Sequence, residues 1–390
     1  MKGKFIQRTV SALRRFLRSG RRLFWRMSSE CSGQNGLSIL MVKSAPRRSR
    51  AGAEMFFAST LKTCLRPFGH WVDIGVPEFW NRRLHYDIIH IHWPHWLVRT
   101  KRDRTTAEDV EEVRQRLAEL KSQGTAIVYT RHNEIPHWNA NPYDIALCRL
   151  VEDESDRVIH MGRTSIARMT AGRGSRDVLI PHHGFDKYPV KGKAEARRRL
   201  GLSPEERVVA AVGVYREKRE RQLVLEVCQS ARIPGLRLLS PGLFKPFRGE
   251  ASENFLTWRR QLGDIYPRQS EGWITVEEMA DCLSAADIVF IQRVQVLNSG
   301  NLPLGFHFGK VVVGPDRGNV GEILQETGNP VFDPDDPVSV VEALKKGLEL
   351  AERGKGDENA RYAQQNWNLD LFAEAHDKLY RSLHADGRND

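Results

Sequence analysis

Histidines follow several segments of the chain that have the composition of buried strands. His92 comes at the end of "YDIIHIH", His132 and Asn133 follow "TAIVYTR", and His182 follows "DVLIP". The carboxyl ends of parallel strands meet at one edge of a sheet, where open α/β folds bind ligands. His132 is therefore expected to face a cleft, whereas His90, inside its strand, is more typical of a hydrogen-bonded core histidine. No HExxH spacing is present, which argues against a histidine metal site.

Cations and small polar residues follow two expected strands in the second half of the chain. In "GVYREKR", Arg216 and Lys218 lie within one turn of a strand end, and their side chains suit a phosphate or diphosphate. In "LNSGN", the N–H groups of Ser299, Gly300 and Asn301 open a helix, where the dipole favours an anion. A solvated basic loop and a plain N-cap are the simpler interpretations of each motif alone. Together, the two motifs predict an anion site.

The bulk composition is that of a globular protein of two domains. The chain has 390 residues, of which 40% are hydrophobic and 28% are charged. Five cysteines are scattered without a CxxC pair, so neither a zinc site nor a disulfide framework is indicated. Reduced thiols favour the cytoplasm. Neither GxGxxG nor GxxxxGK[ST] is present, so a Rossmann dinucleotide site and a P-loop are not supported.

The net charge of +11 is concentrated in residues 1–27, which hold nine lysines and arginines and no acidic residue. The rest of the chain is close to neutral, which argues against a nucleic-acid surface. Ile6, Val10, Leu13 and Leu17 recur at helical spacing opposite the arginines. This pattern predicts a basic amphipathic helix on an anionic membrane surface, with a disordered tail or a targeting peptide as the alternative. The sequence contains no run of about 18 apolar residues that would predict a spanning helix.

Strand-like and helix-like segments alternate along the rest of the chain, which predicts βαβ units and parallel sheets. The expected strands cover residues 37–42, 86–92, 125–133, 157–161, 177–184, 208–215, 236–242, 287–292 and 310–315. We therefore expect two doubly wound domains of similar size, over residues 37–190 and 191–365. A final helix within residues 366–390 is expected to cross back onto the first domain.

The order of these motifs resembles that of glycosyltransferases with the GT-B fold, close to the family 4-like group of bacterial polysaccharide and lipid-linked sugar transferases. The resemblance spans residues 37–385 and rests on "YDIIHIHWP", "VYTRHN", "IPHHGFD", "VGVYREKR", "AADIVFI", "VVVGPDRGNVGEIL" and "GNPVFDPDD". Each motif is weak alone, and it is their common order and spacing that carry the resemblance.

The resemblance implies an α/β chain of two Rossmann-like domains that face a cleft. A nucleotide diphosphate sugar would be the donor, and its phosphates would be held in the C-terminal domain by Arg216, Lys218, Ser299, Gly300 and Asn301. The acceptor would lie on the N-terminal domain, where the residues of the acceptor site or cleft would be Gly52, His92, Asn133 and His182. No metal or other cofactor is then needed, because cations and amides of the protein stabilise the charge that the leaving diphosphate gains.

The sequence departs from this family at several positions. Many retaining members carry two glutamates eight positions apart, where this chain has Val296 and Leu304. Arg219 replaces the usual glycine of the phosphate loop. Retaining or inverting stereochemistry therefore stays open. An inverting reaction needs a base for the acceptor hydroxyl, and His132 and Glu134 are the nearest candidates by position.

These observations favour a membrane-associated glycosyltransferase on the cytoplasmic face of the plasma membrane. It would move a hexose to a lipid-linked or growing saccharide in exopolysaccharide biosynthesis. The alternatives are a nucleotide-sugar epimerase or phosphorylase of the same fold, and an inactive GT-B module that acts as a membrane scaffold. The presence of Arg216, Lys218 and His132 favours an enzyme, and the loss of the glutamate pair favours an inactive module.

Overall fold

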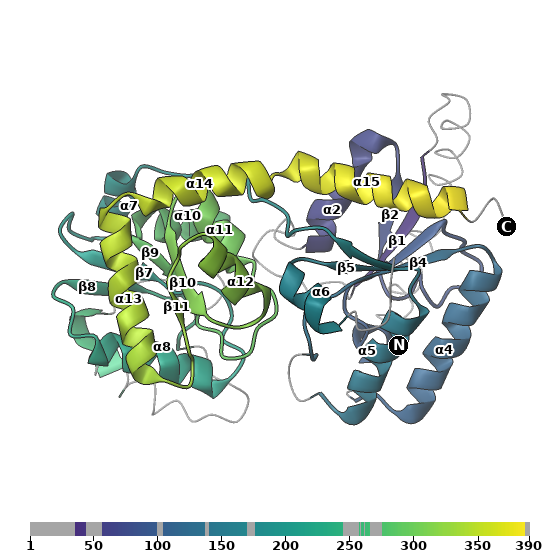
Figure 1. Cartoon of the computed structure of the whole chain (residues 1–390), viewed down its shortest axis with the longest axis horizontal. Coiled ribbons are helices and arrows are strands. Elements are labelled where there is room, and N and C mark those ends of the chain that lie inside the picture. The colour runs from purple at the N-terminus through teal and green to yellow at the C-terminus, as the bar shows by residue number, and fades with distance from the viewer. Residues whose placement is uncertain are drawn as a thin grey trace, which may run out of the picture.

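The computed structural model describes residues 36–43, 57–99, 104–136, 140–169, 176–244 and 275–386, with a few residues between 257 and 265. Two parallel sheets lie side by side along the long axis of the molecule, each with helices packed on its faces (Figure 1). This arrangement confirms the doubly wound α/β architecture expected from the alternation of strands and helices. The basic segment of residues 1–27 and Gly52 lie outside the described residues.

The first sheet has six parallel strands in the order β2-β1-β3-β4-β5-β6. Its strands are β1 (Ser38–Val42), β2 (Trp71–Ile74), β3 (Ile88–Ile91), β4 (Ala126–Thr130), β5 (Arg157–His160) and β6 (Asp177–Leu179). The helices between them are α2 (Phe57–Leu65), the short 3-10 helix η2 (Arg66–Phe68), α3 (Trp96–Arg99), α4 (Ala107–Ser122), α5 (Pro142–Glu154) and α6 (Arg163–Met169). Thr106 and Asn141 start α4 and α5 with capping boxes, in which each side chain satisfies a helix N–H group.

Alternate residues of the first sheet pack against different helices, as the two-residue period of a strand requires. Leu40 and Val42 join the core that contains α4 and α5, whereas Ile39 and Met41 join the core that contains α2 and the last helix, α15 (Leu369–Asp386). Both faces of the sheet are therefore covered, which explains why its strands are continuous apolar runs.

The second sheet has five parallel strands in the order β11-β10-β9-β7-β8. Its strands are β7 (Arg207–Ala210), β8 (Leu236–Leu239), β9 (Ile288–Phe290), β10 (Val311–Pro315) and β11 (Val331–Phe332). Its helices are α7 (Lys193–Arg199), α8 (Lys218–Ser230), the 3-10 helix η4 (Gly263–Ile265), α10 (Val276–Ala285), α11 (Asn301–His307), α12 (Gly318–Glu326), α13 (Pro337–Glu352) and α14 (Lys355–Asn366).

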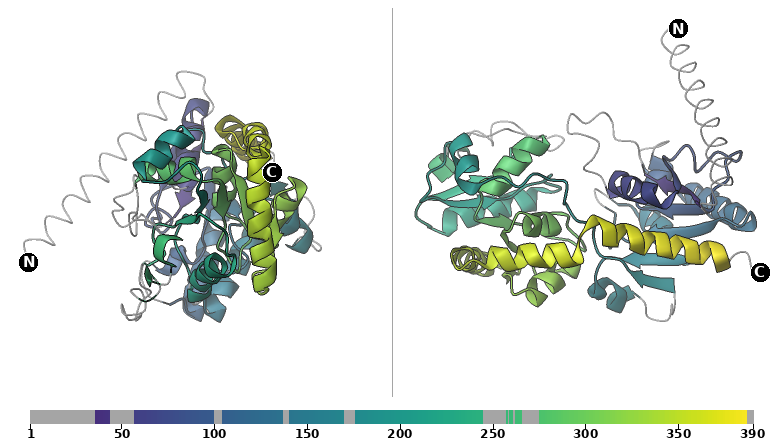
Figure 2. Two further views of the ribbon diagram at one scale, coloured as in Figure 1. Left: turned by 90° about the vertical axis from the view of Figure 1, so that its left-hand side faces the viewer. Right: turned by 90° about the horizontal axis from the view of Figure 1, so that it is seen from above.

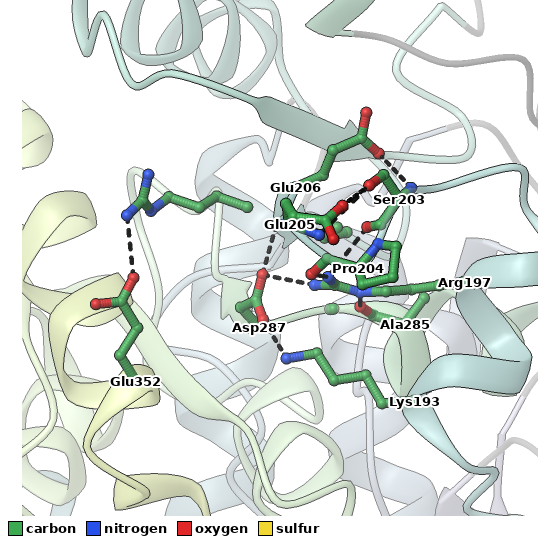
Figure 3. A network of polar contacts seen from close by, with 12 residues as sticks. Lys193, Arg197, Ser203, Pro204, Glu205, Glu206, Ala285, Asp287 and Glu352 are labelled. Carbon is green, nitrogen blue, oxygen red and sulfur yellow. Dashed lines mark hydrogen bonds and ion pairs between the residues drawn. The ribbon is translucent and has the colours of Figure 1, made fainter.

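A polar network joins residues at the amino-terminal edge of this second sheet, which is the edge away from the expected site (Figure 3). Asp287 precedes β9 and accepts hydrogen bonds from the Val208 N–H at 2.7 Å and from Arg197 Nη2 at 2.9 Å, and it pairs with Lys193. Arg197 also donates to the Ala285 carbonyl at 3.1 Å. The network ties α7 to two strands and leaves the opposite edge free for binding.

The chain crosses between the domains twice, and the two crossovers touch. A Cβ atom on Gly184 would lie 1.7 Å from the Trp367 carbonyl oxygen, so only glycine fits there. The Asp186 carboxylate accepts a hydrogen bond from the Leu369 N–H at 2.9 Å. From this point α15 runs back across the first domain (Figure 2, right).

Helix α15 supplies part of the first domain's core. Tyr380 donates or accepts a 2.7 Å hydrogen bond with His90 Nδ1, and Asp377 lies 2.7 Å from His70 Nε2. Both histidines are buried, so the last helix satisfies polar groups that the first domain cannot satisfy by itself.

Candidate functional site

Histidine and aromatic rings gather at the carboxyl-terminal edge of the first sheet. Phe57, the first residue of α2, has ring centroids 5.4 Å from His92, 4.8 Å from His132, 5.5 Å from His182 and 5.3 Å from His183. The four imidazoles, called here the histidine cluster, come from the segments that follow β3, β4 and β6. The structure thus brings together three of the sequence-predicted positions, His92, His132 and His182.

His92 and His132 form a direct pair within the histidine cluster. His92 Nδ1 lies 3.1 Å from His132 Nε2, and the His132 ring stacks on Trp93 with centroids 4.3 Å apart. The other nitrogen of His92, Nε2, is buried and has no hydrogen-bond partner among the described residues. His90 lies behind the pair and contacts the Thr130 hydroxyl at 2.6 Å, as expected for a core histidine.

Burial keeps three imidazoles of the histidine cluster neutral, those of His92, His182 and His183. It lowers the pKa of His182 to about 4 and that of His183 to about 3, and it lowers the pKa of His92 well below its ordinary value. Neighbouring imidazoles add to the shift at His92 and His183, because each disfavours a second positive charge nearby. A neutral imidazole keeps a lone pair, so this edge has groups that accept a proton from a hydroxyl near neutral pH.

The structure separates the two sequence-predicted bases. His132 is buried in the cluster, whereas Glu134 is exposed and lies 3.3 Å from Arg168 of α6 in an ion pair. Asn133, between them, is half-buried. The geometry therefore favours His132 over Glu134 as the group close to the other site residues.

The corresponding edge of the second sheet carries guanidinium groups. The segment after β7 turns at Gly213 with φ 105°, and a Cβ atom there would lie 3.4 Å from Asn301 Nδ2. Arg293 follows β9, is buried, and donates to Glu220 Oε2 at 2.6 Å. The Arg216 N–H donates to the same oxygen at 2.6 Å. One carboxylate thus fixes both segments around the turn.

Arg216 is half-buried, and its surroundings disfavour the charged form of its guanidinium. Burial first, and then repulsion from Arg293, lowers the pKa of the Arg216 guanidinium to about 9, although Glu220 opposes the shift. A guanidinium that is desolvated beside a second one gains from a nearby anion. Lys218, in contrast, is the first residue of α8 and is exposed, with no ion pair in the described part of the chain.

The segment before α11 offers backbone donors beside this turn. The N–H groups of Ser299 and Gly300 have no acceptor among the described residues, whereas the Asn301 N–H donates to Ser299 Oγ at 3.3 Å. The Asn301 side chain donates to the Val212 carbonyl at 2.7 Å. Asn301 therefore holds the segment against β7, and the two preceding amides remain for a ligand.

The two edges meet through the segment that precedes α11. Asn298 Nδ2 donates to the carbonyls of Arg131 at 3.2 Å and His132 at 3.0 Å, and its Oδ1 accepts from Asn319 Nδ2 at 2.7 Å. A Cβ atom on Gly300 would lie 3.6 Å from His182 Nε2. The histidine cluster and the guanidinium groups thus border one interdomain site.

Sequence reasoning missed Arg293, Glu220 and Phe57. Arg293 had a usable signal, because it follows the buried strand in "DIVFIQR" just as Arg216 follows β7. The two positions where relatives carry glutamates are apolar here, with Leu304 buried in the second domain's core and Val296 packed against it. A ribose contact from either position is therefore absent.

The described residues contain no group of three or more histidine, cysteine, aspartate or glutamate side chains arranged to hold a metal ion. Metal independence stays a prediction. Within the same residues, no helix combines the length and apolar character needed to cross a bilayer.

Sequence comparison finds two kinds of curated relative. A GDP-mannose:glycolipid 4-beta-D-mannosyltransferase from Xanthomonas campestris pv. campestris is 23% identical over 265 residues, which cover 66% of this chain and 70% of the relative. A D-inositol 3-phosphate glycosyltransferase from Mycobacterium marinum is 28% identical over 167 residues, which cover 40% of this chain and 33% of the relative. No family model matches the chain.

Solved structures share the whole architecture. Sucrose-phosphate synthase from Thermosynechococcus elongatus has a TM-score of 0.69 at 16% identity, over 90% of this chain and 99% of that one. Anabaena HepE in complex with UDP-glucose has a TM-score of 0.63 at 13% identity, over 89% and 100%. Likenesses at these identities establish the fold.

Proposed function

We propose that this chain transfers a hexose from a nucleotide diphosphate sugar to a lipid-linked or growing saccharide. It is a glycosyltransferase of the GT-B fold, similar to family 4, that uses nucleotide sugars. The mannosyltransferase relative acts on GDP-mannose and a glycolipid, which makes GDP-mannose the first donor to test. We place the reaction in exopolysaccharide biosynthesis. Residues 1–27 would attach the enzyme to the anionic inner face of the plasma membrane, an attachment that their removal would test.

The observation that carries the donor assignment is the pair of guanidinium groups at the interdomain edge. Glu220 pairs with Arg293 and accepts the Arg216 N–H, and the two guanidinium groups repel each other in a partly desolvated site. A diphosphate would bind to the two guanidinium groups, and the N–H groups of Ser299 and Gly300 would hydrogen-bond to it. These fixed donors stabilise the leaving group as the bond to the sugar breaks.

The histidine cluster supplies the acceptor side of the reaction. The acceptor hydroxyl attacks the anomeric carbon, the bond to the donor diphosphate breaks, and the diphosphate keeps the electron pair. The hydroxyl proton goes to a neutral imidazole, and His132 is the one whose backbone the donor segment contacts.

A thermal-unfolding panel of the purified chain tests the donor class. GDP, UDP, ADP and CMP, and then the matching nucleotide sugars, would be added at millimolar concentration. Binding to the folded state raises the melting temperature by mass action. We expect GDP or UDP to raise it and CMP, a monophosphate, to leave it unchanged. Absence of a shift with every nucleotide would contradict a nucleotide-sugar donor and favour the inactive module.

A further inference from the structure

A cavity of about 340 Å³ lies beside the two crossovers and shares only His183 with the histidine cluster. Its walls come from α2 of the first domain, from the first crossover at residues 183–188, from Val276 at the start of α10 and from Leu369 at the start of α15. We call it the hinge pocket. Because both domains and both crossovers contribute to it, a ligand there would contact the part of the molecule about which the domains move.

The lining of the hinge pocket is strongly basic. Lys62, Arg66 and Lys187 line it, and no aspartate or glutamate does. Neither Arg66 nor Lys187 pairs with a carboxylate among the described residues. Asp186, the acidic neighbour of Lys187 in the sequence, accepts the Leu369 N–H instead. Cations that line a concave site favour an anionic ligand.

The remaining lining residues specify what the anion is attached to. The hydroxyls of Ser59 and Thr60 lie on the same face of α2 as Lys62, and they suit the oxygens of a phosphate. Ile74, Phe185 and Val276 add an apolar wall. A free inorganic phosphate would use only the polar part of this lining, whereas a phosphate ester with a hydrocarbon group would use both.

The hinge pocket is close to the histidine cluster through α2. Phe57, at the centre of the cluster, precedes Thr60 by three residues, which is about 4.5 Å along a helix axis. His183 belongs to both the cluster and the lining. The hinge pocket and the histidine cluster therefore adjoin each other at His183.

We infer that the hinge pocket binds the phosphate group of the lipid-linked acceptor, beside its hydrocarbon chain, and so directs the acceptor sugar toward the histidine cluster. This inference rests on the proposed function, since it names the acceptor class for the same transfer. Lys62, Arg66 and Lys187 neutralise the phosphate, and the apolar wall receives the first carbons of the lipid. The acceptor then contacts both domains before the donor reacts.

Calorimetric titration of the full chain with geranyl phosphate, a soluble phosphate with an apolar tail, tests the inference. Inorganic phosphate is titrated in parallel. The test variant combines Arg66→Glu with Lys187→Glu, and Lys345→Glu on the exposed face of α13 is the matched charge-reversal control. The Arg216→Ala variant reveals any phosphate bound at the donor site. Thermal unfolding checks that each variant is folded.

We expect the double variant to weaken geranyl phosphate binding at least about tenfold, because each reversal replaces an attraction with a repulsion. Lys345→Glu and Arg216→Ala should leave it unchanged, and nucleotide binding by the double variant should match that of the unaltered chain. An equal affinity in the double variant would overturn the inference. Inorganic phosphate that binds as tightly as geranyl phosphate would also overturn it, in favour of a free-phosphate site. In either case intact nucleotide binding would leave the proposed function standing.

Discussion

The two sheets of this chain have the same parallel topology, but the edges that face each other carry opposite chemistry. The first sheet ends in buried imidazoles that pack against Phe57 and Trp93. Burial lowers the pKa of His92 and that of His183. The second sheet ends in the guanidinium groups of Arg216 and Arg293, beside Glu220, and in two amides that have no acceptor among the described residues. Burial removes the charge of an imidazole, whereas a guanidinium keeps its charge and becomes a stronger anion site.

This difference gives each domain a separate role in a transfer reaction. A nucleophilic hydroxyl needs a neutral proton acceptor, and a leaving diphosphate needs fixed positive charge. Fixed cations beside the imidazoles would lower the imidazole pKa further and so make these groups weaker proton acceptors. The contact of Asn298 with the His132 carbonyl brings the two edges together without mixing their charges.

Replacing the central imidazole should give the largest effect. His132→Gln keeps a hydrogen-bonding side chain but removes the base, so kcat should fall by about 10³-fold with nucleotide affinity unchanged. Steady-state kinetics with calorimetric binding measure the two quantities. His85→Gln, an exposed histidine of the same domain, is the control. A kcat within threefold of the unaltered enzyme would show that His132 is not the base.

The corresponding substitution in the second domain should alter nucleotide diphosphate binding rather than kcat. Arg216→Ala should weaken nucleotide diphosphate binding by about 100-fold, since it removes a partly desolvated charge from the anion site. Arg353→Ala, which removes an exposed cation at the end of α13, is the matched control. If calorimetry gives equal affinities for the Arg216 variant and the control, the diphosphate does not bind at this turn.

Acid should destabilise the first domain, and we expect this effect to be smaller than those of the two substitutions above. Burial lowers the pKa of His376 to about 4, so the unfolded chain takes up a proton first as the pH falls below about 6.5, and stability drops toward pH 4. From pH 7.5 to 5.5 this one group should cost about 1 kcal/mol. Urea unfolding of His376→Phe should show a pH dependence that is weaker by that amount.

The second domain provides the internal control for this prediction. His307 is its only histidine, and its side chain is half-buried, whereas His376 is fully buried. A fluorescent label in the second domain should therefore report little loss between pH 7.5 and 5.5. An equal response in both domains would assign the acid sensitivity to groups other than the buried imidazoles.

The fold followed from local patterns in the sequence. Strands such as β10 and β9 are short apolar runs bounded by turn residues, and "LPLGFHFG" forms α11 as its place behind a small polar segment indicated. The parallel arrangement followed because helices separate the strands. These features depend on residues that are neighbours in the chain, so they can be predicted from a single sequence.

The site was only partly accessible from the sequence, because its remaining members are joined by long-range contacts. Arg293 is paired with Glu220, 73 positions away, and no local pattern links them. Phe57 looked like an ordinary helix residue, and its role depends on four rings from three other segments. Glu134, chosen by position alone, turns outward to Arg168, since position after a strand does not determine side-chain direction.

The return of α15 to the first domain also affects when that domain can mature during synthesis. Tyr380 and Asp377 satisfy His90 and His70, and Phe372 packs beside Phe57, so the first domain's core depends on residues translated after the whole second domain. While the second domain is still emerging from the ribosome, the first lacks this helix and exposes an apolar face of α2. The second domain can therefore complete its core first, against the usual amino-to-carboxyl order, and the first domain completes its own only when α15 has been synthesised.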